Sequence, residues 1–152
     1  ESRRGPGSYP DLAPLCRELG IAGQVDLRPG FVEDMRDVYR ALDAYVIPSR
    51  GSEGSSRAAL EALASGLPLI ATDVGVLPDL VLDGISGRLI APDDQDALRE
   101  ALIEVRRNWA AAREWGAEAR RRMVKDFGEE PCADKLAKLL YEAAESAKAK
   151  AP

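Results

Sequence analysis

Short apolar runs of strand length alternate along the chain with segments whose apolar residues recur at helical spacing. The clearest strand candidates are "AYVIPS", "LPLIATDV" and "SGRLIAP", at residues 44–49, 67–74 and 86–92. A weaker, short strand lies within "QVDLRPGFV", residues 24–32, and ends near Pro29 and Gly30. The segments that predict helices or helical turns are 10–19, 34–43, 56–65, 77–84, 95–108, 110–125 and 132–147. Strands that are apolar on both faces and alternate with helices are typical of a parallel sheet covered by helices on each side.

The pattern therefore predicts an α/β fold, a Rossmann-like parallel sheet with helices on both faces. A doubly wound sheet usually carries about five or six strands, whereas this chain offers three good strands and a weak one. We expect the first strands of the fold to be missing, with residues 1–128 forming the domain. Residues 129–152 are expected to form a C-terminal helix whose tail, "AKAKAP", frays.

Composition excludes several classes of function. The chain has 152 residues and a net charge of −5, from 21 Lys and Arg against 26 Asp and Glu, which argues against a general nucleic-acid binder. It has no histidine and only two cysteines, so neither a zinc site nor a histidine general base is expected. No apolar run reaches the about 20 residues that span a bilayer, and no signal-peptide pattern opens the chain. A cytoplasmic, metal-free protein without a cofactor is the simplest interpretation.

The loop between the first good strand and its following helix carries the candidate chemistry. In a doubly wound fold, ligands bind outside the carboxyl ends of the strands. The backbone N–H groups at the helix start would form a site for an anion or a hydroxyl, and Glu53 would stand in the same crevice. The residues that contribute these N–H groups are Gly54, Ser55, Ser56 and Arg57.

Glu61, eight residues after Glu53, has an alternative interpretation. A pair of glutamates at this spacing arises readily by chance in so acidic a chain. Glu61 also follows Arg57 by four residues, the spacing of a modest solvent-exposed ion pair on a helix. On spacing alone, the ion pair is the better interpretation.

The surrounding string changes this balance, because residues 42–94, "LDAYVIPSRGSEGSSRAALEALASGLPLIATDVGVLPDLVLDGISGRLIAPDD", resemble the donor-binding half of glycosyltransferase family 4. These are retaining enzymes of the GT-B fold. The matching elements, in order, are Pro48-Ser49, Glu53-Gly54, Glu61, Ala64 to Pro68, Ala71-Thr72, Gly75 to Pro78 and Asp83 to Pro92. The resemblance covers roughly residues 10–128, and Ser55-Ser56 departs from the Phe-Gly that is frequent in the family.

The resemblance implies transfer of a sugar from a UDP-, GDP- or ADP-sugar to an acceptor hydroxyl, with retained configuration and without a metal. Glu53 would be the catalytic residue, holding the donor sugar, and Glu61 would hold the ribose. The amides of Gly54, Ser55 and Ser56 would face the sugar and phosphate. The nucleobase would lie near Gly30, Phe31 and Val32.

Parts of such an enzyme are absent from this chain. The family's Arg and Lys, in a "GR….KG" pattern, neutralise the leaving diphosphate, but Arg3, Arg4 and Arg17 do not match their places. The N-terminal acceptor domain is also missing, so we expect the fragment alone to be inactive and the missing domain to be its partner. Peripheral attachment to the inner membrane face through that domain stays open. The alternatives are a non-catalytic nucleotide-sugar binding module, a GT-B-fold nucleotide-sugar epimerase, or a structural domain that uses its C-terminal helices as a partner surface.

Overall fold

The computed structural model describes residues 11–28, 32–51, 54 and 56–149, without the side chains of 147–149. The chain divides into two compact units, Glu1–Glu33 and Asp34–Pro152. In the first unit, α1 (Ala13–Glu18) lies where the pattern predicts a helix, and Gly20 ends it in the left-handed conformation, at φ +68°. A short 3-10 helix, η1 (Ala22–Gln24), follows.

The short strand predicted within residues 24–32, ending near Pro29 and Gly30, is wrong for the residues that the structure describes. Residues 25–28 belong to no strand, although Val25 has extended backbone angles. Val25 and Leu27 are 37% and 41% exposed, and no described residue pairs with this segment. An alternating pattern predicts an extended conformation, but a strand also requires a hydrogen-bonded neighbour, which this segment lacks here. Residues 29–31 lie outside the described residues.

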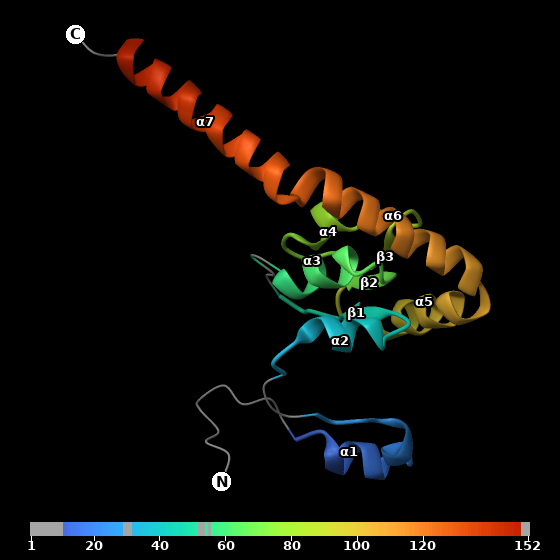
Figure 1. Ribbon diagram of the computed structural model, residues 1–152. Helices are drawn as coiled ribbons and strands as arrows, with labels where there is room; N and C mark the ends of the chain where they lie inside the picture. The colour runs from blue at the N-terminus through green and yellow to red at the C-terminus, as the bar shows by residue number, and fades with distance from the viewer. Residues whose placement is uncertain (1–10, 29–31, 52–53, 55, 150–152) are drawn as a thin grey trace. The chain divides into compact units, whose positions relative to one another are not determined.

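The second unit is built on a three-stranded parallel sheet in the order β1-β2-β3 (Figure 1). Its strands are β1 (Tyr45–Ile47), β2 (Leu69–Thr72) and β3 (Gly87–Ile90), within the three strongest apolar runs. Tyr45 pairs with Leu69, and Leu69 with Gly87. The helices of the unit are α2 (Met35–Arg40), α3 (Arg57–Ala64), α4 (Leu77–Leu80), α5 (Gln95–Arg107), α6 (Trp109–Phe127) and α7 (Glu129–Ala149).

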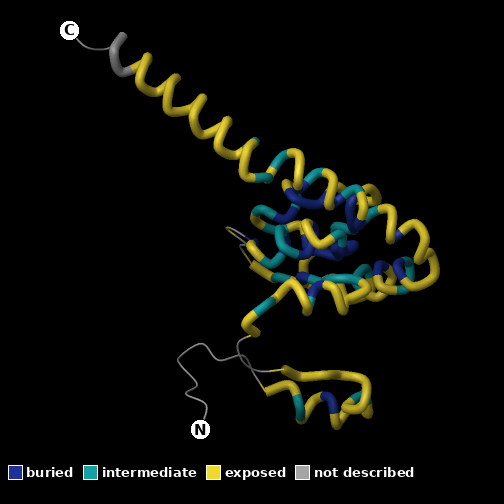
Figure 2. Tube along the Cα trace, viewed as in Figure 1, coloured by how far each residue is buried: buried dark blue, intermediate teal, exposed yellow. Residues whose placement is uncertain are grey.

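Successive residues of β2 point to opposite faces of the sheet, and each face is covered by helices. Leu69 and Ala71 pack in one cluster with buried residues of α3, α4 and α6, among them Leu63, Leu77 and Met123. Ile70 packs on the other face, in a cluster with Ala101 and Val105 of α5 and Ala112 of α6. The buried segments accordingly lie in the middle of this unit (Figure 2). The predicted α/β class, a parallel sheet between helices, is confirmed.

The last helix is longer than predicted. α7 spans Glu129–Ala149, so the start of the "AKAKAP" tail is helical rather than frayed; residues 150–152 are outside the described part. Alanine and lysine are strong helix formers, which favours this continuation. Residues 133–146 are all exposed, including Leu136, Leu139 and Leu140 (Figure 2). The predicted division of the chain at residue 128 stays a prediction. Within the described ranges, no helix is long and apolar enough to cross a membrane.

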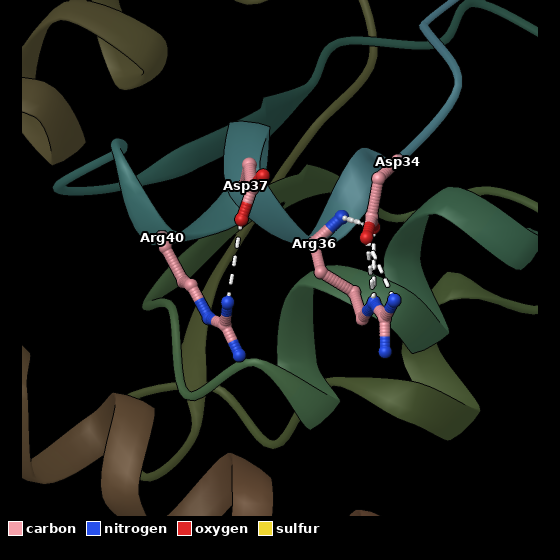
Figure 3. Close-up of polar contacts among 4 residues, drawn as sticks. All are labelled: Asp34, Arg36, Asp37 and Arg40. Atoms are coloured by element: carbon pink, nitrogen blue, oxygen red, sulfur yellow. Dashed lines mark hydrogen bonds and ion pairs between the residues drawn. The ribbon is translucent and has the colours of Figure 1, made fainter.

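Asp34 caps the N-terminus of α2 (Figure 3). Its carboxylate accepts hydrogen bonds from the backbone N–H of Arg36, at 2.9 Å, and from the Arg36 guanidinium, at 2.7 Å for the shortest contact. The side chain of Arg36, and after it the backbone N–H, lower the pKa of Asp34 from 3.8 to about 2. Because the folded-state pKa is lowered, the cap stabilises the folded chain above pH 4, and this contribution is lost as the pH falls through about 2.

We therefore expect Arg36→Gln to raise the pKa of Asp34 part of the way back to its ordinary value. The backbone hydrogen bond survives this substitution, so the recovery is incomplete. A carboxyl carbon NMR titration of both proteins measures the shift. Arg40→Gln is the control, because Arg40 pairs with Asp37 at 3.3 Å and is the smallest of the causes that lower the pKa of Asp34, so this substitution should raise that pKa much less. A midpoint for Asp34 that Arg36→Gln leaves unchanged would contradict the assignment of the guanidinium as the main cause.

Candidate functional site

The loop that leaves β1 and leads into α3 lies at the carboxyl end of the sheet, as predicted. Ser56 has non-helical backbone angles, φ −81° and ψ 82°, and α3 begins directly after it with a run of helix formers. The side chain of Ser56, the N-cap residue, makes no capping hydrogen bond to this helix. The first N–H groups of a helix have no partner within the helix, which makes such a terminus a suitable site for an anion. Gly54 is exposed, and a side chain at its position would meet no atom within 4 Å.

The predicted site residues fall into three groups. Glu53, Ser55, Gly30 and Phe31 lie outside the described residues. Val32 belongs to the first unit, where it is 40% exposed. Gly54, Ser56, Arg57 and Glu61 belong to the second unit, and the structure brings Arg57 and Glu61 into direct contact.

Both carboxylate oxygens of Glu61 are engaged, each by a different helix. Arg57 Nε donates to Oε1 at 2.6 Å, which is the ion pair that the four-residue spacing predicts. The hydroxyl of Tyr39, on α2, donates to Oε2 at 3.1 Å. The Glu61 side chain is 33% exposed, whereas that of Arg57 is 89% exposed. Glu61 is thus more than a solvent-facing charge, because a residue from a separate helix also holds it.

Tyr39 is a residue that the sequence analysis missed as part of the site. It is 3% exposed, and its ring meets that of Tyr45 edge-to-face, with centroids 5.7 Å apart. Burial, and after it the hydrogen bond with Glu61, raise the pKa of Tyr39 to about 12. The helical pattern indicates only that position 39 is buried. A buried tyrosine hydroxyl needs a hydrogen-bond partner, but the pattern does not identify one that lies 22 residues further on.

Thr72 joins the carboxyl ends of β1 and β2, a contact that its place in the family pattern does not indicate. Thr72, the last residue of β2, is 2% exposed, and its hydroxyl donates to the carbonyl oxygen of Ser49 at 2.7 Å. A small pocket of about 150 Å³ opens beside it, lined in part by Pro48, Thr72 and Asp94. Arg50 and Asp93 form an ion pair of 2.6 Å from two of the loops at this edge. The hydrogen bond from Thr72 therefore holds the start of the loop after β1 against the end of β2, at the edge where the site is predicted.

Thr72→Val removes the hydroxyl and keeps the shape of the side chain. We expect it to lower the free energy of unfolding by about 1–3 kcal/mol, because a carbonyl oxygen loses a buried donor. Urea denaturation measures the change, and Thr72→Ser, which keeps the hydroxyl, is the matched control. A loss in Thr72→Ser with none in Thr72→Val would show that the methyl group, rather than the hydrogen bond, matters at this position.

No three His, Cys, Asp or Glu side chains converge as a possible metal site in the part of the chain that the structure describes. The expectation that the reaction needs no metal stays a prediction. What the described arrangement offers is an uncapped helix N-terminus next to a carboxylate whose position is held by two donors. Such a pair of features suits a ligand that carries both an anionic group and hydroxyl groups.

Comparison with known proteins places the chain in a family. The family described as "Glycosyl transferases group 1" matches residues 4–108. Among curated proteins, D-inositol 3-phosphate glycosyltransferase of Mycobacterium marinum is 41% identical over 112 residues, which is 73% of this chain and 24% of that protein. The chain thus spans about a quarter of the length of the curated relatives that it matches.

Solved structures agree on the fold. HepE from Anabaena, in complex with UDP, matches 86% of this chain and 36% of its own, with a TM-score of 0.81 and 22% identity; the complex of HepE with UDP-glucose has a TM-score of 0.79. Sucrose-phosphate synthase from Thermosynechococcus elongatus matches 88% of this chain and 33% of its own, with a TM-score of 0.78 and 29% identity. The parallel sheet between helices is that of GT-B glycosyltransferases.

Proposed function

The chain belongs to the group 1 glycosyl transferases, and from this membership we propose that it forms the donor-binding part of a retaining glycosyltransferase of family 4. The whole enzyme would move a sugar from a nucleotide diphosphate to an acceptor hydroxyl. UDP-sugars are the first donors to test, because HepE has been solved with UDP and with UDP-glucose. D-inositol 3-phosphate is the first acceptor to test, because it appears in the names of the relatives.

The observation that carries this proposal is the state of the Glu61 carboxylate. A carboxylate offers about four acceptor positions, two on each oxygen. Arg57 occupies one position on Oε1 and Tyr39 one on Oε2. No other described residue bonds to these oxygens, so each keeps one position, which suits the two neighbouring hydroxyls of a ribose. The uncapped N-terminus of α3, four residues before Glu61, would receive the diphosphate.

In this mechanism the residues of the chain hold and stabilise the donor. As the bond between sugar and diphosphate breaks, negative charge grows on the diphosphate, and the N–H groups of α3 would stabilise it together with basic residues elsewhere in the enzyme. Glu53 would hold the donor sugar as positive charge develops on it, a positioning role rather than proton transfer. The acceptor would be bound by the part of the enzyme that lies outside this chain.

The 152 residues alone would act as a nucleotide-sugar binding module. The chain spans about a quarter of its relatives, and the proposed acceptor site does not lie within it. Incubating the chain with a UDP-sugar and D-inositol 3-phosphate separates the two functions, because a module binds the donor without forming a product. A transferred sugar would contradict the proposed division of labour.

Saturation-transfer NMR with UDP-, GDP- and ADP-sugars tests donor binding directly. We expect the protons of one nucleotide to receive saturation from the chain, with ribose protons among those most strongly affected. Competition by the corresponding nucleoside diphosphate would show that the sugar is not required for contact. Equal responses to all three nucleotides would contradict a selective nucleobase site.

A further inference from the structure

We propose that Tyr39 is a positioning residue of the nucleotide site, which fixes the Glu61 carboxylate so that its free acceptor positions meet the ribose hydroxyls. This inference rests on the proposed function, but it concerns a residue outside the loop and helix that carry the predicted site. Tyr39 lies on α2, before β1, whereas Glu61 lies on α3, after it. The hydrogen bond of 3.1 Å between them joins two helices that the strand separates in sequence.

The Tyr39 hydroxyl is itself held in place by its surroundings. The ring packs in a buried cluster with Ala62 and Leu67, and Tyr45 of β1 contacts it edge-to-face, at an interplanar angle of 69°. A side chain that is 3% exposed and enclosed on several sides has little freedom to change rotamer. The hydroxyl is therefore a fixed donor, pointing at one oxygen of Glu61.

Arg57, the other donor to Glu61, cannot supply the same restraint. Its side chain is 89% exposed, and exposed ion pairs are weakened by solvent and by the entropy of the long side chain. Arg57 also lies on α3 itself, so its contact does not relate Glu61 to any other element of the fold. Of the two donors, Tyr39 is the one that sets the position of the carboxylate relative to the sheet.

The phenol also remains a donor under all ordinary conditions. With its pKa raised to about 12, the hydroxyl keeps its proton throughout the range in which the chain would bind a nucleotide. Tyr39 accordingly acts through Glu61 and does not need to touch the ligand. Its loss should affect the part of binding that depends on the ribose hydroxyls more than the part that depends on the base or the phosphates.

Tyr39→Phe tests this inference by ribose discrimination. UDP, GDP and ADP are each titrated beside the 2′-deoxy analogue by saturation-transfer NMR, and the ratio of the two dissociation constants is the readout. We expect the unmodified chain to prefer its ribonucleotide by about tenfold or more, and Tyr39→Phe to reduce this preference to about threefold or less. Tyr45→Phe is the matched control, because it removes a hydroxyl from the other ring of the same pair. The Tyr45 hydroxyl makes no hydrogen bond to any described residue, so this variant should keep the preference for the ribonucleotide.

The outcomes separate the positioning role from the alternatives. If Tyr39→Phe weakens binding of the ribonucleotide and of its 2′-deoxy analogue equally, Tyr39 is only structural and the inference is wrong. If Glu61→Gln removes the preference while Tyr39→Phe keeps it, the inference is wrong but the proposed ribose role of Glu61 stands. If the unmodified chain shows no preference for any ribonucleotide over its 2′-deoxy analogue, both the inference about Tyr39 and the proposed ribose role of Glu61 are wrong. Support requires that Tyr39→Phe lose the preference and add no further loss when combined with Glu61→Gln.

Discussion

Glu61→Gln should lower the affinity of the chain for its nucleoside diphosphate by at least about tenfold. Glutamine keeps the shape of the side chain and one oxygen that Tyr39 can still donate to, so the substitution should leave the packing of α3 in place. It removes the negative charge and replaces one acceptor oxygen with a donor. Hydrogen bonds to a charged acceptor are stronger than those to a neutral one, and one of the two proposed ribose contacts is lost outright.

The affinity is measured by saturation-transfer titration with the nucleotide that the unmodified chain selects. Glu100→Gln is the matched control, because it makes the same chemical change at an exposed position on α5. Thermal unfolding of all three proteins shows whether a loss of binding is only a loss of folded chain. An affinity that Glu61→Gln leaves unchanged, in a folded protein, would return Glu61 to the role of a helix ion pair with Arg57.

The elements of the second unit could be predicted because each is dictated by local chemistry. β2 lies inside a short apolar run, the pattern that is typical of a strand covered on both faces. α3 ends where Gly66 adopts φ +81°, a conformation that glycine reaches without strain. The segment at 24–32 shows the limit of this reasoning, because alternation alone does not supply a neighbouring strand.

The contacts of the candidate site could be predicted only within one element. The pair of Arg57 and Glu61 follows from a four-residue spacing on a helix. The bonds from Tyr39 to Glu61 and from Thr72 to Ser49 join residues 22 and 23 positions apart, so they exist only once the helices and strands have packed. For that reason, the sequence pointed to the loop, to Glu61 and to Arg57, whereas the contacts of Tyr39 and Thr72 became visible only in the folded chain.

The contact between α6 and the turn before β2 leads to the largest expected change in stability. Gly116, in the middle of α6, lies against the backbone of Gly66, and Arg120 donates to the carbonyl oxygen of Ala64 at 3.0 Å. This contact holds α6 against the end of α3, and through it against the face of the sheet that Leu69 and Ala71 line. A helix can approach a backbone so closely only where it carries no side chain.

We expect Gly116→Ala to lower the free energy of unfolding by about 2 kcal/mol or more. This direction is opposite to the one that the same substitution has in an ordinary helix. In an ordinary helix, glycine to alanine stabilises by about 1 kcal/mol. Here the new Cβ would overlap the Gly66 carbonyl oxygen and lie 2.9 Å from the Gly66 carbonyl carbon, so rigid backbone must move. Urea denaturation measures the change. Gly51→Ala is the control, because a Cβ at position 51 meets no atom within 4 Å. It should change the free energy of unfolding little. A Gly116→Ala protein as stable as the unmodified chain would mean that α6 does not lie this close to the turn.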